Sequence, residues 1–315
     1  MHVADQGKVL RVTYGLIAAT AWAASTVAAA NAARRLGTFY AVLISQALGL
    51  MTLGVLTALL HPSLAAAGHA LAGLAAAGVL GLAGWLFYYR ALESGPVGLV
   101  SAIGASYGGV TALLAVTLLG EHIGGFGGAG VMPAVGGVAL AVARAPAASD
   151  TPADVDAADR GPRHSVVLAE KPRAGLLRQG TTLALASALT YGVGAFLLGR
   201  YSGGAGWLPS TLVSYAASVF SLVLVLPFVR PPVKTGGGPA GLLWAVAAGL
   251  TETVALVAFS RGGQVGQVAI TAAVSSLYPA LALGAGIVLF RERLSGQQLV
   301  GVGCIATGLL VLGLT

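Results

Sequence analysis

Long apolar runs, separated by short polar breaks, follow one another along most of this 315-residue chain. A helix needs about 20 mostly apolar residues to cross the hydrocarbon core of a bilayer, and ten runs come close to that length or exceed it. Only 9% of the residues are charged, whereas an average soluble domain has about 25%. The chain therefore has too few charges for a soluble surface, and the runs predict an all-α membrane protein with ten transmembrane helices.

The expected spans are the apolar runs between polar breaks. They cover residues 12–31, 37–60, 69–90, 97–119, 124–144, 180–200, 208–230, 239–260, 267–290 and 296–314. Ala and Gly are frequent in these spans, which favours close helix packing through small residues. The first run is longer than the apolar core of a signal peptide, which is about 7–15 residues, so we expect it to remain as a span.

One hydrophilic segment divides the spans into two groups of five. Residues 145–178 contain charges of both signs and several prolines. Such a composition cannot bury a core of its own, so it predicts a flexible linker. We expect residues 1–144 to form a first repeat and residues 179–315 to form a second repeat.

The two groups of spans resemble each other in sequence. Shifts of 171 or 169 residues align the following pairs: Arg90 with Arg261, Tyr107 with Tyr278, Glu121 with Glu292, and, with the shorter shift, Trp22 with Tyr191. Because five is an odd number, the second repeat must enter the membrane from the opposite side. This predicts two inverted five-helix repeats, an arrangement common among transporters, with a substrate site between the halves near the middle of the membrane.

Glu252 is the acidic residue that lies deepest within an expected span. A charged side chain at the centre of a membrane helix costs about 2.5–3.5 kcal/mol on insertion scales, and such residues usually face the bundle interior. Ala245, Ala248, Gly249 and Ala255 share its helix face. We expect Glu252 to accept a proton in coupled transport or to bind a cationic or amino group of the substrate. The alternative is a structural carboxyl bonded to a neighbouring helix.

The ninth span carries a polar helix face. Thr271, Ser275 and Tyr278 are spaced by four and three residues, which places them on one side of a helix. Pro279 has no N–H, so it should kink the helix and leave the Ser275 carbonyl without its helical donor. These residues predict a polar wall of a central cavity, and a simple proline kink in a packed helix is the alternative.

Aromatic residues within the spans are assigned by the repeat. Tyr107 corresponds to Tyr278, but Gly108 replaces the proline, so a weaker kink is expected in the first half. Trp22 and Tyr191 are placed in the substrate site because the repeat pairs them. Aromatic residues near the ends of spans are expected at the membrane interface: Tyr88, Tyr89, Trp207 and Phe228.

Four charged residues at the ends of spans are expected to mark the membrane boundary. Arg90 and Arg261 lie at matching helix ends, where each can offset the helix dipole and reach lipid phosphate. Glu121 and Glu292 follow the fourth and ninth spans and are expected to face water.

Motifs for metal binding, nucleotide binding or catalysis are not found. The single cysteine and five histidines have no metal-site spacing, and the glycine runs lack the context of a phosphate-binding loop. We therefore expect no metal, no cofactor and no enzyme activity, while proton coupling stays open. The net charge of +7 indicates attraction to anionic lipid rather than binding to nucleic acid.

The two halves carry a recognisable pattern in "GASYGGVTALLAVTLLGEHIGGFGGAGVMPAVGGVALA" (104–141) and "SSLYPALALGAGIVLFRERLSGQQLVGVGCIATGLLVLG" (275–313). With five spans on each side, the chain resembles the EamA-like branch of the drug/metabolite transporter superfamily. The resemblance implies a secondary transporter of the plasma membrane that moves a small metabolite by alternating access, as a monomer or a homodimer. Export of amino acids or related metabolites is the leading prediction. Multidrug or organic-cation efflux is the first alternative, and a non-transporting receptor or scaffold is an alternative of another class.

The charges and the family resemblance disagree on membrane orientation. With a cytoplasmic N-terminus, four of the 17 Lys and Arg residues would lie inside, namely Lys8, Arg11, Arg200 and Arg261. The remaining thirteen would lie outside, so the positive-inside rule favours an external N-terminus and a cytoplasmic linker. The family resemblance implies cytoplasmic termini.

Overall fold

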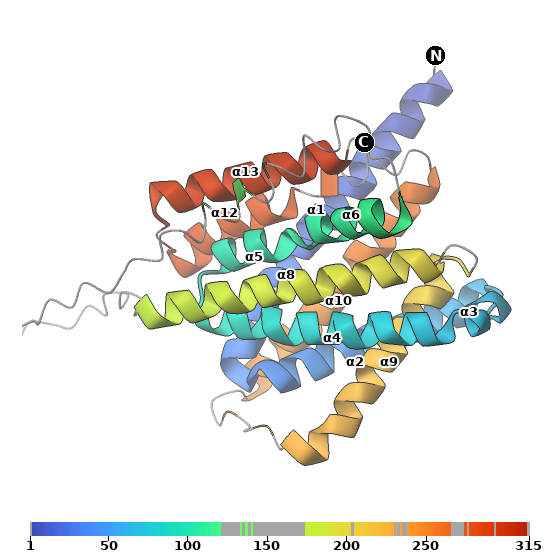
Figure 1. Ribbon diagram of the computed structural model, residues 1–315, viewed down its shortest axis with the longest axis horizontal. Helices are drawn as coiled ribbons and strands as arrows, with labels where there is room; N and C mark the ends of the chain where they lie inside the picture. The colour runs from blue at the N-terminus through green and yellow to red at the C-terminus, as the bar shows by residue number, and fades with distance from the viewer. Residues whose placement is uncertain are drawn as a thin grey trace, which may run out of the picture.

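The fold is given by a computed structural model that describes residues 2–120, 133, 136–137, 140, 174–202, 205–229, 231, 234, 238–265, 274–275, 277–292 and 294–313. Figure 1 shows a bundle of helices. They are α1 (His2–Leu36), α2 (Thr38–Leu60), α3 (Ala65–His69), α4 (Leu71–Ser94), α5 (Val97–Ala105), α6 (Tyr107–Leu119), α8 (Ala174–Ser202), α9 (Trp207–Val229), α10 (Gly238–Val265), α12 (Tyr278–Phe290) and α13 (Gly296–Gly313).

Seven helical segments in the described residues are long and apolar enough to cross a membrane. They are Val12–Leu36, Thr38–Leu60, Leu71–Ser94, Val97–Leu119, Arg178–Ser202, Trp207–Val229 and Gly238–Phe259. These segments coincide with the first four expected spans and with the sixth to the eighth. α12 is a shorter apolar helix. The chain is therefore an all-helical, multi-pass membrane protein in the part that the structure describes, while the expected span 124–144 lies almost entirely outside that part.

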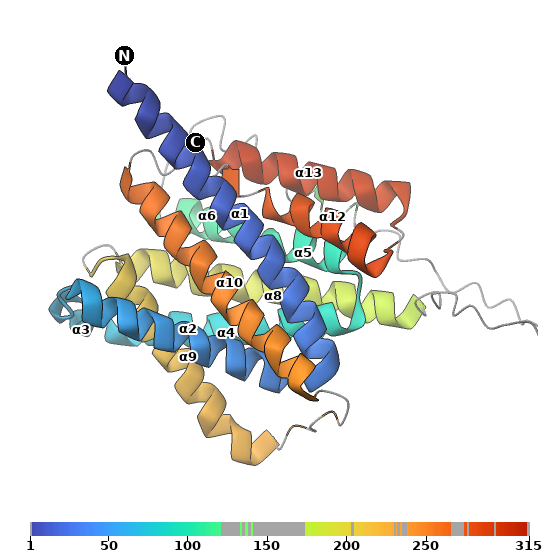
Figure 2. The ribbon, with the colours of Figure 1, turned by 180° about the vertical axis from the view of Figure 1, so that it is seen from behind.

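The helices of the two halves correspond to each other. Both bounds of α9 are those of α2 shifted by 169 residues, and both bounds of α12 are those of α6 shifted by 171. The repeat also pairs α1 with α8 and α4 with α10. The contact of α1 with α10 then corresponds to the contact of α8 with α4, and these are the two most extensive interhelical contacts. Figures 1 and 2 show α1 ending on the side of the bundle where α8 begins. Paired helices thus run in opposite directions, as an inverted repeat requires.

Several helix ends meet on one side of the bundle. We call this side the linker face, because α8, which follows the linker in sequence, begins there, and α1, α4 and α12 end there (Figures 1 and 2). The beginning of α1 and the end of α13 lie on the opposite side. Residues near the ends of α1, α4 and α12 therefore lie near the linker face.

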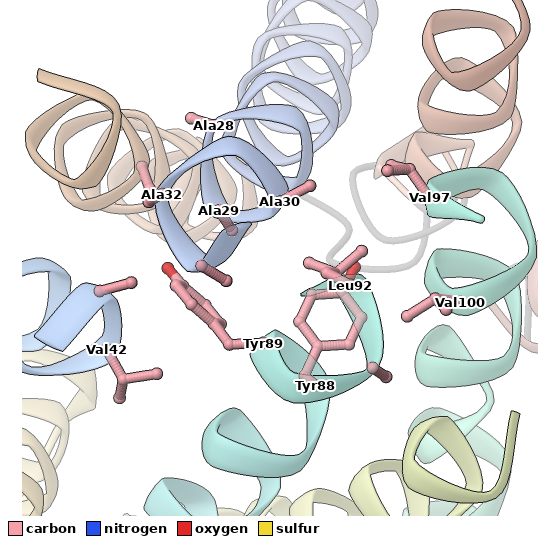
Figure 3. Close-up of a cluster of buried hydrophobic side chains, with 14 of the residues drawn as sticks. Ala28, Ala29, Ala30, Ala32, Val42, Tyr88, Tyr89, Leu92, Val97 and Val100 are labelled. Carbon is pink, nitrogen blue, oxygen red and sulfur yellow. The ribbon is translucent and has the colours of Figure 1, made fainter. Parts of the chain in front are cut away.

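The main core lies where α1 packs against α10 and α4, and alanine dominates it. Ala28–Ala30 of α1 share one cluster of buried residues with Ala245 and Ala248 of α10. Figure 3 shows the alanines of α1 beside Leu92 of α4 and Val97 of α5. Because alanine has a small side chain, the helix backbones can approach each other closely.

The fourth expected span is interrupted rather than continuous. Ser106 lies between α5 and α6, and its Oγ donates a hydrogen bond to the Ile103 carbonyl oxygen at 2.6 Å. A serine that bonds to its own backbone in this way competes with the helical pattern. Leu277, which a shift of 171 pairs with Ser106, forms the turn before α12. In the described residues, a turn thus precedes both α6 and α12, while most of the second-half residues before Leu277 lie outside the described part of the chain.

The sequence predicts a kink at Pro279. In the structure this proline lies in the first turn of α12. The N–H groups of a first turn have no helical acceptor, so a proline there loses no hydrogen bond. The amides of Ala280 and Leu281 instead bond to the Leu277 carbonyl oxygen. Within the described residues, Pro279 therefore lies at the beginning of α12.

Tyr88 and Tyr89 were predicted at the membrane interface, and this is wrong. Their relative exposures are 8% and 3%. The Tyr88 hydroxyl shares a hydrogen bond with Thr26 Oγ1 at 3.2 Å, and the Tyr89 hydroxyl donates to Ser45 Oγ at 3.1 Å. Because each hydroxyl has a polar partner, both tyrosines can lie in the core.

Candidate functional site

Glu252 directs its carboxylate from α10 toward α1. Trp22 Nε1 donates to Oε1 at 3.2 Å, and Ser25 Oγ lies 3.2 Å from Oε2. Ser25 Oγ also lies 3.1 Å from the Ala248 carbonyl oxygen, and its single hydrogen can serve only one of these acceptors at a time. An ionised carboxylate has about four acceptor positions. The described residues therefore leave Glu252 with capacity for a proton or a cationic group.

Glu252 forms no ion pair within the described residues. The two ion pairs found there both involve Glu93, which meets Arg90 and Lys234. The rest of the Glu252 helix face is small and buried, as the sequence predicts: Ala245, Ala248, Gly249 and Ala255. An acidic side chain inside the membrane has a high free energy of insertion, and such residues commonly mark substrate or proton pathways.

Aromatic rings from both halves lie beside Glu252. The ring centroid of Trp22 on α1 is 5.6 Å from that of Phe259 on α10 and 5.9 Å from that of Tyr278, the first residue of α12. Trp22 belongs to the first half, and the other two rings belong to the second. This group of rings therefore joins the halves where Glu252 lies.

A second group of rings lies on the other helices of the bundle interior. Tyr191 on α8 is 4.8 Å from Tyr107 on α6 and 5.6 Å from Trp85 on α4, measured between ring centroids. Tyr88 connects this group to α1, because its ring centroid is 5.8 Å from that of Trp85 and its hydroxyl bonds to Thr26 Oγ1 at 3.2 Å. The second group of rings therefore lies next to the helix that carries Trp22.

The central residues of this site keep part of their surface exposed. Trp22, Tyr107, Tyr191, Glu252 and Tyr278 are all half-buried, whereas the alanines beside them in the core are buried. A ligand needs such accessible surface on the side chains that bind it. We call these five residues the central site.

The structure brings together five of the predicted substrate residues, which are those of the central site. Ser275 is buried, and Thr271 lies outside the described residues. Sequence reasoning missed Tyr88, whose ring centroid is 5.8 Å from that of Trp85. Their spacing of three residues, which puts both on one helix face, was the signal that could have identified it.

The predicted boundary charges differ in their surroundings. Arg90 is exposed and forms an ion pair with Glu93 at 2.9 Å. Arg261 is exposed near the end of α10, and Glu121 lies outside the described residues. In the described part of the chain, no three His, Cys, Asp or Glu side chains gather closely enough to hold a metal ion.

The sequence predicts that Glu292 faces water, but in the structure its carboxylate is bonded to another helix. Its carboxylate accepts hydrogen bonds from the backbone N–H groups of Val97 and Gly98, the latter at 3.0 Å. Burial raises the pKa of the Glu292 carboxyl, while these two hydrogen bonds and the nearby Arg34 act in the opposite direction. Glu292 thus makes a contact between the halves at the linker face.

The fold and the central site together define a class: a multi-pass membrane protein with two opposed repeats and a carboxyl group between them. The EamA-like transporter family matches residues 10–143 and 178–314. The chain belongs to this family, whose members are membrane transporters and not enzymes.

Solved structures add a likeness in fold. Thirteen of their chains match. One, titled "Crystal structure of protein", has a TM-score of 0.59 and 18% sequence identity, and the match covers 96% of this chain and 95% of that chain. No curated protein sequence matches.

Proposed function

We propose that this protein is a secondary transporter of the plasma membrane that exports amino acids or related amine-bearing metabolites by alternating access. Ten spans, in repeats at 1–144 and 179–315 joined by the linker 145–178, form the transport unit. Family membership supports transport of a small molecule. The central site supports the substrate class, because it offers one carboxylate to an ammonium group.

The observation that carries the proposal is the environment of Glu252. Its carboxylate has two side-chain hydrogen-bond donors, Trp22 and Ser25, and no cationic partner among the described residues. A substrate ammonium can supply the missing charge, and the rings of Trp22 and Tyr278 can contact the apolar part of the substrate. Protonation of Glu252 when the substrate leaves would couple export to proton entry.

Organic-cation efflux is the second candidate. An amino acid also carries a carboxylate, which needs a donor or a positive charge. Among the described residues, no Lys or Arg is bonded to Glu252 or stacked on a ring of the central site. This observation favours a substrate with a cationic group and no carboxylate.

Flux through proteoliposomes tests both candidates with one series of compounds. L-leucine, L-leucinamide and 4-methylpentanoate share a side chain but differ in their ammonium and carboxylate groups, and tetraethylammonium represents the organic cations. We expect flux of the compounds with a positive group and none of 4-methylpentanoate. Glu252→Gln should lower the flux about tenfold to hundredfold, because it removes a hydrogen-bonded charge contact.

The controls keep the helix intact. Glu252→Asp retains the charge and should retain part of the flux. Thr253→Val changes the next residue, whose Oγ1 bonds to the Gly249 carbonyl of its own helix at 2.8 Å, and should transport normally. Wild-type flux in well-folded Glu252→Gln, or flux confined to sugars and nucleosides in a wider panel, would contradict the proposal.

A further inference from the structure

The two halves are joined at the linker face by a helix cap that crosses between them. α5 begins after Pro96, which provides no side-chain cap. The first N–H groups of a helix lack helical acceptors. Glu292, from the second half, accepts those of Val97 and Gly98. Arg291, in a left-handed conformation with a φ of 53°, ends α12 just before Glu292.

The cap lies on a close contact between α5 and α12. A Cβ atom at Gly98 would lie 2.9 Å from Leu283 Cα, and one at Gly286 would lie 3.2 Å from the Gly98 nitrogen. Only residues without side chains allow such an approach. The Glu292 carboxylate is therefore held over the beginning of α5 as long as α5 and α12 stay together.

A second polar contact joins the halves at the same face. Lys234, which precedes α10 in the second half, donates to the Glu93 carboxylate and, at 3.3 Å, to the Arg34 carbonyl oxygen. Glu93 and Arg34 lie near the ends of α4 and α1 in the first half. The Arg34 guanidinium carbon also lies 4.7 Å from the ring centroid of Phe290, at the end of α12.

These contacts lie far from the central site along the same helices. Trp22 and Arg34 are twelve residues apart on α1, which is a rise of about 18 Å in an α-helix. Ala28–Ala30 of the alanine core lie between these two residues along α1. In this conformation a layer of packed apolar side chains separates the central site from the linker face.

Polar contacts at this position can open at modest cost. The Lys234 side chain is 41% exposed, so water can solvate its ammonium after the contact breaks. Water at the membrane boundary can also satisfy the N–H groups of Val97 and Gly98. The same groups deep in the membrane would have no substitute partner.

We propose that Arg34, Glu93, Lys234 and Glu292 form a polar gate that keeps the transport pathway closed at the linker face. Separation of Glu292 from α5 and of Lys234 from Glu93 removes these polar contacts between the halves at the linker face. The alanine core can then part, and the central site becomes accessible from this face. The gate goes beyond the substrate assignment and can be tested without any substrate.

A buried cysteine reports whether the gate is closed. Cys304 is the only cysteine, so Cys304→Ser removes the native thiol, and Val100→Cys places a thiol of similar size in the core on α5, where Val100 is 1% exposed. A membrane-impermeant maleimide should label this thiol slowly from either side. Glu292→Gln and Lys234→Gln should each speed labelling from the linker face by about tenfold, because loss of one charge-assisted contact shifts the equilibrium toward the open state.

The controls separate gating from general loosening. Arg291→Gln removes an exposed charge next to Glu292 and should leave the labelling rate unchanged. Lys234→Gln alters only a partly exposed side chain, so it tests the gate even where Glu292→Gln folds poorly. Unchanged labelling in Lys234→Gln, or faster labelling from both membrane faces, would overturn the proposal.

Discussion

The hydrogen bonds of Ser25 and Trp22 determine how the Glu252 carboxylate can change its partner. The Ser25 hydroxyl has two acceptors, the Glu252 carboxylate and the Ala248 carbonyl, and one hydrogen to donate. Trp22 provides a donor whose direction is fixed by its ring. When a substrate ammonium or a proton occupies Glu252, Ser25 can turn to Ala248 without losing a hydrogen bond. The helix pair α1 and α10 can therefore accommodate both states of the carboxyl group.

Trp22→Phe tests this view of the residue. The phenyl ring keeps the apolar contact with Tyr278 but cannot donate to Glu252. Loss of one hydrogen bond, worth about 0.5–1.5 kcal/mol, should raise the KM for L-leucinamide about threefold to tenfold in proteoliposomes. Trp244→Phe, at a tryptophan of α10 that packs against the core, is the control. Equal effects of the two substitutions would show that Trp22 acts by packing alone.

Helices of this protein approach each other where glycine replaces a side chain. At Gly78 on α4, an added Cβ would lie 3.0 Å from Ser214 Cα on α9, and at Gly84 it would lie 3.0 Å from the Tyr191 nitrogen on α8. Ser218 Oγ also donates to the Gly78 carbonyl oxygen at 2.7 Å. Close backbone contact thus brings serine hydroxyls within reach of carbonyls on the next helix, as small residues do in membrane bundles.

Gly78→Ala and Gly81→Ala provide a matched pair on α4. An added methyl at Gly78 meets the Ser214 backbone, whereas at Gly81 it meets nothing within 4 Å. Gly78→Ala should therefore destabilise the protein by about 1–3 kcal/mol, while Gly81→Ala should be neutral or stabilise it by up to about 1 kcal/mol. Thermal unfolding in detergent measures the difference. Equal melting temperatures would contradict the close contact of α4 with α9.

Periodicity and composition predict the helices well but not their interruptions. The bounds of α2 and α9 follow from apolar runs that end at polar breaks. The break at Ser106 has no proline, the flanking Gly104 and Gly108 resemble many other glycines of this chain, and the break coincides with a short hydrogen bond to Ile103. Glu252 could be found because one carboxylate in an apolar run is conspicuous. Its partner Trp22 lies 230 residues away, and only the repeat suggested its place.

The contacts of the polar gate could not be predicted from spacing. Lys234 and Glu93 are 141 residues apart, and Glu292 and Gly98 are 194 apart. Each of these charges lies next to a helix end, where an ordinary solvated charge is the usual outcome. Only the packing of the two halves shows that they meet.

At the scale of the whole molecule, positive charge collects on one side of the membrane. Arg34, Arg35, Arg90, Lys234 and Arg291 all lie near helix ends at the linker face. Among the described residues, the acidic groups at the same face are Glu93 and Glu292, and both are bonded to protein groups. An excess of Lys and Arg marks the cytoplasmic side of a membrane protein.

We therefore expect the linker face to be cytoplasmic. In the background without Cys304, Ser165→Cys in the linker should react with an impermeant maleimide only in inside-out vesicles. Ser63→Cys, an exposed position between α2 and α3 on the opposite face, should react in intact cells. The reversed pattern would show that the family resemblance, rather than the charges, predicts the orientation.

The alanines between α1 and α10 have a mechanical consequence. The two helices form the most extensive interhelical contact of the molecule together with the equivalent pair α4 and α8. Ala28–Ala30, Ala32, Ala33 and Ala245 have no side-chain torsions, so one helix can slide or tilt on the other at these residues without any change of rotamer. Packed cores of large side chains resist such displacement because they interlock. The halves thus meet at smooth surfaces, and the polar contacts at the ends, rather than the core, determine when they move.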